Sequence, residues 1–370
     1  MRIFSVCADR GIPPGGAKGA SIHLRSLARA LRQEGAEVVL FTERGPEPGP
    51  EAASIQDLDV RPLDLLAEAA EVAPPDIVYE RYSLGSGVGL AQARRIGCAF
   101  VLEVNAPLLL EANLHRPGSV PAGAARIEEQ LFREADLVVA VSEPLRRIVA
   151  GVRGKDAGTA VVWNGADEKL LDIARMKRPE ETATLVFLGN PKPWHGAETL
   201  PDLMARLEEK GCPARLLVIG GGKGADSLMA RAREQGIDDR VEITGPVASS
   251  RVGELLSRAD VAIAPYPPAD PFYFCPLKVI ESMMAGLPVV TTRQGDLEAI
   301  TRGAALLVPP GDPEALVEAV RSLLESPDTA RELGERARER AASALTWRHS
   351  ARSLLALVPG AGVSRGQEVI

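Results

Sequence analysis

Short apolar runs alternate with amphipathic stretches along almost the whole chain. Near-continuous apolar runs predict strands that are buried on both faces, and the helical windows between them predict crossover connections of a parallel sheet. A helix is predicted over 21–34, where Leu24, Leu27, Ala28 and Leu31 share one face. In the first half of the chain the predicted strands are 2–7, 38–42, 76–79, 99–104, 136–141 and 160–163.

The alternation lapses over the charged segment 167–184, which we interpret as a linker, and then restarts. In the second half the predicted strands are 185–188, 215–219, 241–244, 260–265, 289–292 and 305–308. Two such series predict an α/β protein with two doubly wound parallel sheets. In these sheets ligands bind beyond the carboxyl ends of the strands, so a site is expected in a cleft between the two domains. A frayed tail is expected over 360–370.

Composition narrows the classes of partner. A chain of 370 residues suits two domains, and a net charge of −7 without a basic run argues against nucleic acid. The four cysteines are scattered, which favours reduced thiols in a cytoplasmic protein over a disulfide scaffold or a zinc site. No signal peptide is recognised and no apolar run reaches the ~18 residues of a membrane span. Arg94 and Arg95 are too few to predict binding to an anionic membrane, so peripheral membrane contact stays open, as does the oligomeric state.

One stretch, 271–290, combines several signals of an anion site. Pro276 suits the first position of a helix, Lys278 lies in its first turn, and Gly286 ends it. Glu281 lies on the same face as Lys278. Helix-terminal amides with a lysine attract an anion, and a neighbouring carboxylate suits hydroxyl groups. A nucleotide sugar is a ligand that offers both.

Other constellations flank the predicted strands. The glycine-rich turn GGAKGASIHL, 15–24, lets the backbone approach a ligand closely, but it is not the dinucleotide pattern GxGxxG. Ser142 is expected to cap a helix, and Asn164 with Gly165 to form a turn. Polar side chains follow two strands and are candidate sugar or acceptor contacts: Glu80, Arg81, Glu103 and Asn105.

The stretch PLKVIESMMAGLPVV resembles the nucleotide-sugar motif of family 4 (GT4) retaining glycosyltransferases, which have the GT-B fold. Further segments resemble motifs of that family in the same order, so the resemblance covers nearly the whole chain: GGAKGASIHL, YERYS with LEVNAP, ADLVVAVSE with WNGAD, VFLGNPKPWHG, TGPV and LTWRHSARSLLAL. It implies two Rossmann-like domains facing a cleft. The N-terminal, acceptor-side domain would span 1–170 and be joined by the last helix, 345–360, and the nucleotide-sugar-binding domain would span 183–344.

The resemblance implies a hexosyltransferase-type enzyme that moves a sugar from a UDP- or GDP-linked donor to a hydroxyl-bearing glycan, lipid-linked or small-molecule acceptor. No cofactor beyond the donor and no metal are implied. Lys278 would stabilise the leaving diphosphate, Glu281 would hold the ribose, and Asn105 would lie near the reacting sugar. The acceptor side would include His23, Glu80, Arg81 and Glu103. The donor contacts implied are Gly19, Gly189, Asn190, Lys192, His195, Gly245, Val247, Tyr273, Phe274, Cys275, Pro276 and Leu277.

The chain departs from the family pattern at four positions. Asn190 and His195 stand where an Arg and a Lys usually contact the diphosphate. Tyr273 stands where a Glu usually contacts the donor sugar, and Asn105 replaces a His that many relatives carry. The departures at Tyr273, Asn190 and His195 leave open a non-catalytic nucleotide-sugar-binding protein. A sugar-nucleotide epimerase or hydrolase of the same fold is a further alternative, which the six ordered motifs disfavour.

Overall fold

The computed structural model describes residues 1–46, 50–173 and 182–358. The chain forms two compact units. The N-terminal unit comprises Met1–Asn164, Tyr273–Cys275 and Trp347–Ile370, and the C-terminal unit comprises Gly165–Phe272 and Pro276–Thr346. Part of the predicted linker 167–184, and the whole predicted tail 360–370, lie outside the described residues.

The N-terminal unit is built on a seven-stranded sheet in which all neighbouring strands are parallel, in the order β3-β2-β1-β4-β5-β6-β7. The six strands predicted from the sequence are confirmed, with small shifts at their ends. β3 was missed because its four residues DVRP are partly or fully exposed and show no apolar run. The strands are β1 (Arg2–Cys7), β2 (Glu37–Thr42), β3 (Asp59–Pro62), β4 (Ile77–Arg81), β5 (Ala99–Val104), β6 (Leu137–Ala140) and β7 (Thr159–Val161).

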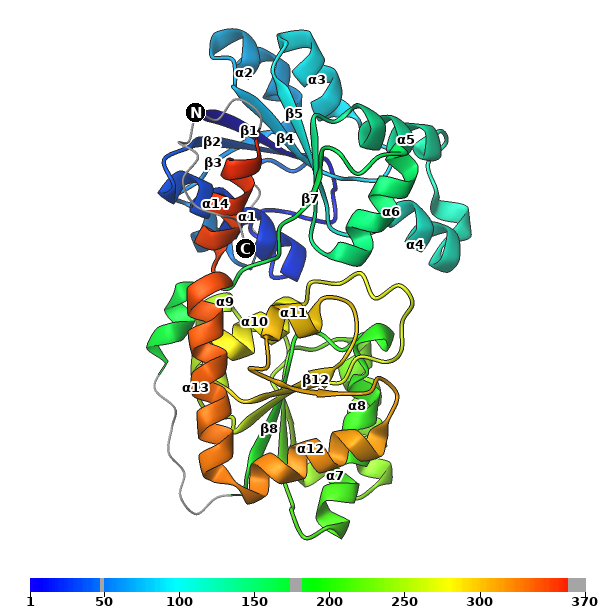
Figure 1. Ribbon diagram of the computed structural model, residues 1–370, viewed down its shortest axis with the longest axis vertical. Helices are drawn as coiled ribbons and strands as arrows, with labels where there is room; N and C mark the ends of the chain where they lie inside the picture. The colour runs from blue at the N-terminus through cyan, green and yellow to red at the C-terminus, as the bar shows by residue number, and fades with distance from the viewer. Residues whose placement is uncertain (47–49, 174–181, 359–370) are drawn as a thin grey trace. The chain divides into compact units, whose positions relative to one another are not determined.

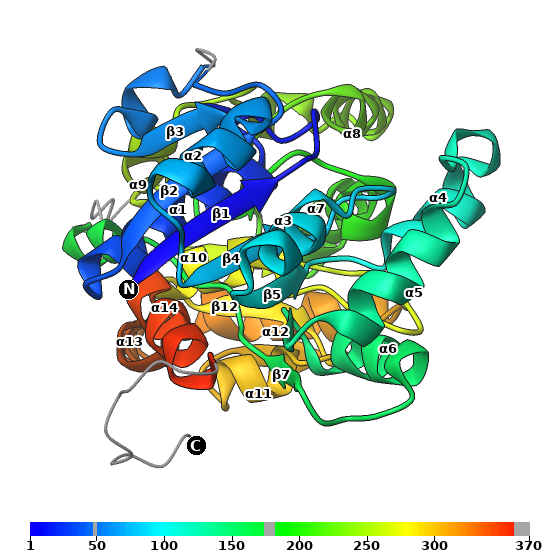
Figure 2. The same ribbon diagram turned by 90° about the horizontal axis from the view of Figure 1, so that it is seen from above.

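Helices cover both faces of this sheet. Figure 2 shows α2 and α3 together over one face, and α1 packs against the C-terminal helix α14. The last helix of the chain therefore belongs to the first unit. The helices are α1 (Gly19–Gln33), α2 (Leu66–Val72), α3 (Val88–Ile96), α4 (Leu108–His115), α5 (Ala124–Glu134), α6 (Glu143–Arg153) and α14 (Trp347–Leu357), with 3₁₀ turns η1 (Ala52–Ile55), η2 (Leu63–Leu65) and η3 (Pro117–Ser119).

The C-terminal unit is built on a six-stranded parallel sheet in the order β10-β9-β8-β11-β12-β13. Its strands are β8 (Thr184–Leu188), β9 (Arg215–Ile219), β10 (Val241–Ile243), β11 (Val261–Ala264), β12 (Val289–Thr292) and β13 (Leu306–Val308). Its helices are α7 (Leu200–Glu209), α8 (Lys223–Glu234), α9 (Ser249–Leu256), α10 (Leu277–Met284), α11 (Leu297–Thr301), α12 (Pro313–Glu325) and α13 (Pro327–Ala344), with 3₁₀ turns η4 (Glu168–Asp172), η5 (Pro193–His195), η6 (Ala197–Thr199) and η7 (Asp238–Arg240).

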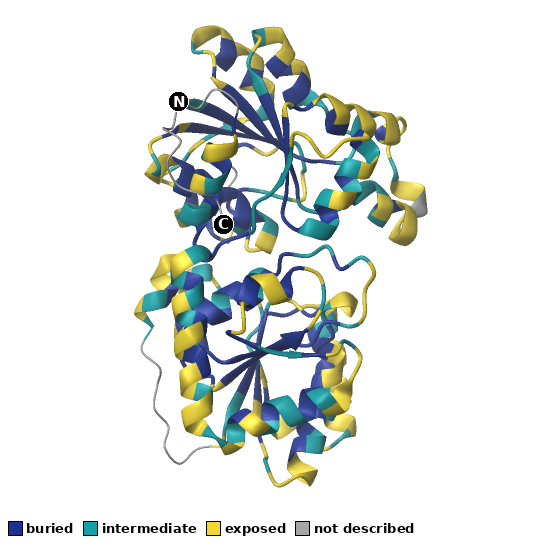
Figure 3. Ribbon diagram, viewed as in Figure 1, coloured by how far each residue is buried: buried dark blue, intermediate teal, exposed yellow. Residues whose placement is uncertain are grey.

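Both faces of the C-terminal sheet are buried, which explains the near-continuous apolar strands. Phe187, Val218 and Ile263 join one core cluster with residues of α7, α8 and α12. Residues of the opposite face, such as Val186 and Ala262, are buried as well. Figure 1 shows helices around each sheet, and Figure 3 shows that the central strands of both sheets, such as β4 and β11, are buried.

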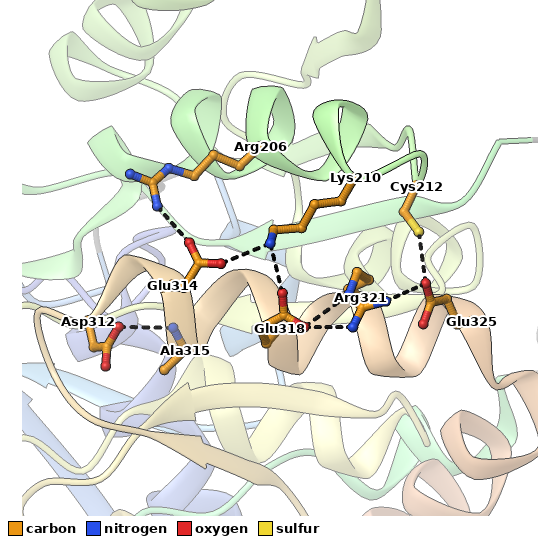
Figure 4. A network of polar contacts seen from close by, with 9 residues as sticks. All are labelled: Arg206, Lys210, Cys212, Asp312, Glu314, Ala315, Glu318, Arg321 and Glu325. Carbon is orange, nitrogen blue, oxygen red and sulfur yellow. Dashed lines mark hydrogen bonds and ion pairs between the residues drawn. The ribbon is translucent and has the colours of Figure 1, made fainter.

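Charged side chains connect α7 to α12 on the surface of the C-terminal unit (Figure 4). Lys210 contacts Glu314 and Glu318 at 2.9 and 3.0 Å, and Arg206 contacts Glu314 at 3.2 Å. The carboxyl of Asp312 caps α12 through the amide of Ala315. Exposed pairs of this kind contribute little to stability. The network is structural, and Lys210 is its lysine.

The strand order of each sheet confirms the predicted doubly wound architecture. The order reverses between β1 and β4 in the first unit and between β8 and β11 in the second. Ligands of such sheets bind beyond the carboxyl ends of the strands at this reversal. Ligand contacts are therefore expected from the residues that follow Cys7 and Arg81 in one unit, and Leu188 and Ala264 in the other.

Candidate active site

Three strand-end loops meet at the carboxyl edge of the C-terminal sheet. The side-chain oxygen of Asn190, after β8, accepts a hydrogen bond from the amide of Gly221, after β9, at 2.8 Å. The amide of Gly220 donates to Oγ1 of Thr244, after β10, at 3.2 Å. Asn190, which replaces the usual Arg, thus connects two of the loops. Gly245 adjoins the same group, because a Cβ on Gly221 would lie 3.1 Å from its Cα.

Gly220 allows these loops to approach each other. Its φ is +147°, and a Cβ there would lie 2.6 Å from the carbonyl carbon and oxygen of Gly189. Sequence reasoning missed the Gly220–Gly222 segment. The signal was available, since three consecutive glycines separate an apolar strand from an amphipathic helix.

Gly220→Ala is expected to lower the melting temperature and weaken binding of nucleoside diphosphates, because the new methyl group displaces the Gly189–Asn190 peptide. Gly222→Ala is the matched control: its φ is +88°, but nothing lies within 4 Å of a Cβ there. The control should show only the strain of positive φ, about 1 kcal/mol. Thermal melts and nucleotide titrations of both variants test this, and equal binding by the two would contradict it.

The helix α10 begins beside these loops. Pro276 is its N-cap rather than its first helical residue, so the predicted start is wrong by one position, and no side chain caps the first amides. The end of α10 is confirmed: Ala285 is the C-cap and Gly286 follows with φ +75°. Leu277 opens the first turn, followed by Lys278.

Lys278 has an unusual environment for a lysine. Its Nζ atom is buried and, among the described residues, has no hydrogen-bond partner. It lies 4.0 Å from the ring centre of Phe187 and 5.8 Å from that of Tyr266. Burial lowers the pKa of Lys278 to about 7, and the nearby Glu281 raises it only in part. A buried amine that lacks a hydrogen-bond partner and lies beside two aromatic faces is arranged for an anionic ligand.

Glu281 is the carboxylate partner of this lysine. Burial raises its pKa to about 7, the charge of Lys278 lowers it, and Asp167 raises it further. Both groups are therefore only marginally charged at neutral pH in the free protein. A ligand that carries negative charge for Lys278 and hydroxyl donors for Glu281 would stabilise the charged form of each.

His195 follows Asn190 across a short turn. Its Nδ1 lies 3.0 Å from the carbonyl oxygen of Asn190, and because a carbonyl only accepts, Nδ1 carries the hydrogen. Burial, and then the charge of Lys278, lower the pKa of His195 to about 3, so the ring is neutral. Its Nε2 is consequently an acceptor, which suits a hydroxyl group better than an ionised phosphate oxygen. Lys192 is exposed and Val247 is partly buried.

A buried polar chain lies in the N-terminal unit. His23 contacts Oε1 of Glu103 through Nε2 at 2.6 Å and Oδ1 of Asn164 through Nδ1 at 2.9 Å. Arg81 reaches the other carboxyl oxygen of Glu103 at 3.5 Å. Three of the predicted acceptor-side residues, His23, Arg81 and Glu103, are thus brought together. The ring of Trp347, the first residue of α14, stands edge-on to His23 at 5.0 Å.

The hydrogen bonds of Asn164 and Glu103 show which atoms donate and which accept around His23. Asn164 donates through Nδ2 to the carbonyl of Cys275 at 2.8 Å, so its Oδ1 accepts from His23. Burial alone would raise the pKa of Glu103, but His23, Arg81 and the hydroxyl of Tyr79 lower it to about 2. The ionised carboxylate of Glu103 lies against Nε2, so each ring nitrogen of His23 faces an acceptor.

Glu103→Gln is expected to lower the free energy of unfolding at pH 7 by about 3 kcal/mol, because it removes the buried carboxylate that His23 and Arg81 contact. The sign with pH follows from the lowered pKa: the stabilisation by Glu103 is complete above its unfolded pKa of ~4.3 and is lost as pH falls towards 2. Denaturant titrations of both proteins between pH 2 and 7 test this. A difference in the free energy of unfolding between the two proteins that stays the same from pH 7 to pH 2 would contradict it.

Glu80 has a different role from its neighbours. Its carboxyl is fully buried and accepts hydrogen bonds from the amide of Gly89, at 3.1 Å, and from Ser86. Burial raises its pKa to about 8. The side chain therefore connects β4 to the start of α3 and is enclosed by protein.

Asn105 is buried without a complete set of hydrogen bonds. Its Nδ2 has no hydrogen-bond partner in the described part of the chain.

The segment Tyr273–Cys275 groups with the N-terminal unit. The hydroxyl of Tyr273 donates to Glu111 at 2.5 Å, and its carbonyl accepts from Oγ of Ser142 at 2.6 Å. The phenol that stands in place of the usual Glu is thus engaged with α4. The ring of Phe274 lies 4.4 Å from that of Tyr273.

Two residues at the ends of strands were interpreted incompletely. Ser142 caps α6 as predicted, and it also holds the carbonyl of Tyr273. The expected turn at Asn164 is wrong: the residue is buried, and its side chain bridges His23 and Cys275. Sequence alone could not show this, because the two partners of Asn164 come from distant segments of the chain.

Gly19 starts α1 and is exposed, and the preceding N-cap Lys18 forms no side-chain cap.

Within residues 1–46, 50–173 and 182–358, no group of three or more His, Cys, Asp or Glu side chains is arranged to hold a metal ion. No described helix is long and apolar enough to span a membrane.

Comparison with known proteins decides the family. Residues 17–170 match the model of Glycosyltransferase Family 4, and residues 182–326 match that of Glycosyl transferases group 1. The chain belongs to the family 4 glycosyltransferases. The family 4 chain is 25% identical over 378 residues to a D-inositol 3-phosphate glycosyltransferase of Kineococcus radiotolerans, covering 88% of this chain and 87% of the relative. It is 27% identical over 279 residues to a glycogen synthase of Mycobacterium tuberculosis, covering 74% and 66%.

Solved structures of similar fold support the two-domain architecture. A sucrose-phosphate synthase of Thermosynechococcus elongatus has a TM-score of 0.73 at 22% identity, covering 96% of this chain and 98% of that one. HepE of Anabaena with UDP-glucose has a TM-score of 0.72 at 18% identity, covering 97% and 100%. The GT-B fold and the glycosyltransferase class are confirmed. The comparisons give no support to an epimerase, a hydrolase or a non-catalytic protein.

Proposed function

We propose that this glycosyltransferase transfers a sugar from a nucleotide diphosphate sugar to a hydroxyl group of its acceptor, with retention at the anomeric carbon. The observation that carries the proposal is the buried Nζ of Lys278 in the first turn of α10, which has no hydrogen-bond partner among the described residues and has Glu281 nearby. A diphosphate supplies the charge that this cation lacks, and a ribose supplies hydroxyl donors for the carboxylate.

Each predicted site residue has a separate role in this reaction. Lys278 and the uncapped amides of α10 stabilise negative charge as the diphosphate leaves, which is a large contribution in many enzymes. We also assign the loop before Gly19 to the donor diphosphate, because of its resemblance to the first glycine loop of the family. The acceptor hydroxyl attacks from the face that the leaving group vacates, and its proton passes to a diphosphate oxygen. Asn105 provides an amide near the reacting sugar and no base.

The three strand-end loops complete the donor pocket. Gly189 and Asn190 border the diphosphate, and the backbone at Gly245 and Val247 faces the nucleobase. His195 accepts a hydrogen bond from a donor hydroxyl. UDP is the first candidate, because a structural neighbour was solved with UDP and with UDP-glucose, and GDP is the second. We place the reaction in the cytoplasm, where nucleotide sugars are made.

Thermal melts with a panel of UDP, GDP and their hexose conjugates test the donor. A ligand that binds only the native state raises the melting temperature, by an amount that grows with its concentration above Kd. We expect stabilisation by one nucleotide family and by its sugar conjugates. If no nucleoside diphosphate stabilises the wild type, the proposed donor is wrong. Acceptor screening with the stabilising donor then follows.

A further inference from the structure

The glycine-rich loop between β1 and α1 has a buried base and an exposed tip. Pro14, Gly15 and Gly16 are buried, whereas the next residues, 17–19, are exposed. The amide of Gly16 donates to the carbonyl of Pro13 at 2.9 Å, which closes a tight turn. A Cβ on Gly16 would lie 2.6 Å from Oγ of Ser21, so the base has no room for a side chain.

Arg25 holds this base in place. Among the described residues, Arg25 has the largest fully buried side chain, with 2% of its surface exposed. Its Nη1 donates to the carbonyl of Gly16 at 2.6 Å and to that of Pro14 at 3.4 Å. Side chains on a helix lean towards its N-terminus, which lets Arg25 reach back from α1 to the loop that precedes it.

Glu51 completes the arrangement from a third segment. Its amide donates to the carbonyl of Gly15 at 2.9 Å. Its carboxylate lies 3.9 Å from Nη2 of Arg25, and only 7% of the residue is exposed. Three consecutive carbonyls of the loop, at residues 14, 15 and 16, are therefore each held by a donor from Arg25 or Glu51.

A buried guanidinium is costly unless it is paired and hydrogen-bonded. Burial lowers the pKa of Arg25, although Glu51 raises it in part. A shorter apolar residue would fill the same helix face at lower cost. Unlike such a residue, the guanidinium of Arg25 holds the loop carbonyls in place.

We propose that Arg25, with Glu51, is a positioning residue that fixes the base of the 13–19 loop, so that its exposed tip and the amides of α1 face the donor diphosphate in one conformation. This inference rests on the proposed function, because the loop is assigned to the diphosphate there. Arg25 itself touches no substrate. Its effect on the reaction passes through the loop.

Arg25→Met, Arg25→Lys and Glu51→Gln test the proposal against Arg153→Met as the matched control. Arg153 is also a buried arginine of the N-terminal unit, 6% exposed, whose guanidinium donates to the backbone carbonyls of Phe132 and Ala135. It ends α6 and has no contact with the loop among its described hydrogen bonds. Both substitutions remove a buried charge, but only one frees the 13–16 segment.

We expect Arg25→Met to raise the Kd for the stabilising nucleoside diphosphate, and the KM for its sugar conjugate, by about tenfold or more, as misplaced positioning groups commonly do. Arg153→Met should change both by less than about twofold at a temperature where circular dichroism shows both variants folded. Arg25→Lys retains the positive charge but lacks the planar guanidinium, so it should restore only part of the affinity for the nucleoside diphosphate. Hydrogen exchange should quicken at residues 13–19 in the Arg25 variants alone.

The outcomes are distinct. Equal Kd values for the Arg25 and Arg153 variants, or unchanged exchange at residues 13–19, would overturn the inference while leaving the donor site in place. If Arg25→Met does not fold, Glu51→Gln, which keeps every backbone contact, decides by the same two readouts. A wild type that binds no nucleoside diphosphate overturns the proposed function, and exchange in the loop still reports on Arg25.

Discussion

Lys278→Ala should lower kcat/KM by about two to three orders of magnitude, the cost typical of removing one group that stabilises developing charge. Stability should not fall in parallel. The Nζ atom is buried without a hydrogen-bond partner in the described part of the chain, so the alanine variant removes an uncompensated polar group. Initial rates with the preferred donor and thermal melts of the same preparations measure the two effects.

Lys210→Ala is the control for that experiment. Lys210 is a lysine of the same unit that bridges Glu314 and Glu318 on the surface. Its loss should leave kcat/KM unchanged and reduce the melting temperature slightly, and only at low salt. Activity of Lys278→Ala equal to that of the wild type would remove Lys278 from the reaction.

Binding of a nucleoside diphosphate should take up a proton above pH 7, and its Kd should rise by up to about tenfold per pH unit between pH 7.5 and 9. Burial lowers the pKa of Lys278 to about 7 in the free protein. A bound diphosphate favours the charged amine and raises that pKa. Between the free and bound pKa values the complex therefore holds one more proton than the free protein.

Glu281 acts in the opposite direction at lower pH. Burial raises its pKa to about 7, and ribose hydroxyls that donate to the carboxylate would lower it and release a proton. At pH 8.5 Glu281 is already ionised, so uptake by Lys278 dominates. Calorimetry at pH 8.5 in buffers of different ionisation enthalpy measures the uptake. It should persist in Glu281→Gln and vanish in Lys278→Met, and uptake unchanged in Lys278→Met would contradict the assignment.

The architecture was readable from the sequence because both sheets are buried on two faces. Apolar runs such as 99–104 and 289–292 coincide with β5 and β12. The edge strand β3 escaped because partial exposure removes the apolar signal. The helix α10 was predicted from Pro276 and Gly286, and its start is displaced by one residue because Pro276 is the N-cap and not the first helical residue.

The site was predicted less completely than the fold. Residue types at strand ends identified Glu103, Arg81 and Glu80, but the sequence did not show that Glu80 is turned into the base of α3. The position of Asn164 depends on contacts with residues far away in the chain. Local patterns predict elements and their ends, whereas the direction of a buried polar side chain is decided by which distant segments pack around it.

Sugar transfer with retention is the central claim, and proton NMR of the complete reaction tests it most directly. The wild type is incubated with its stabilising nucleotide sugar, with and without an acceptor found in the screen. The account predicts release of the nucleoside diphosphate only when the acceptor is present, and an anomeric proton in the product with the same configuration as in the donor. An inverted product, or equal consumption of the donor without acceptor, would contradict it.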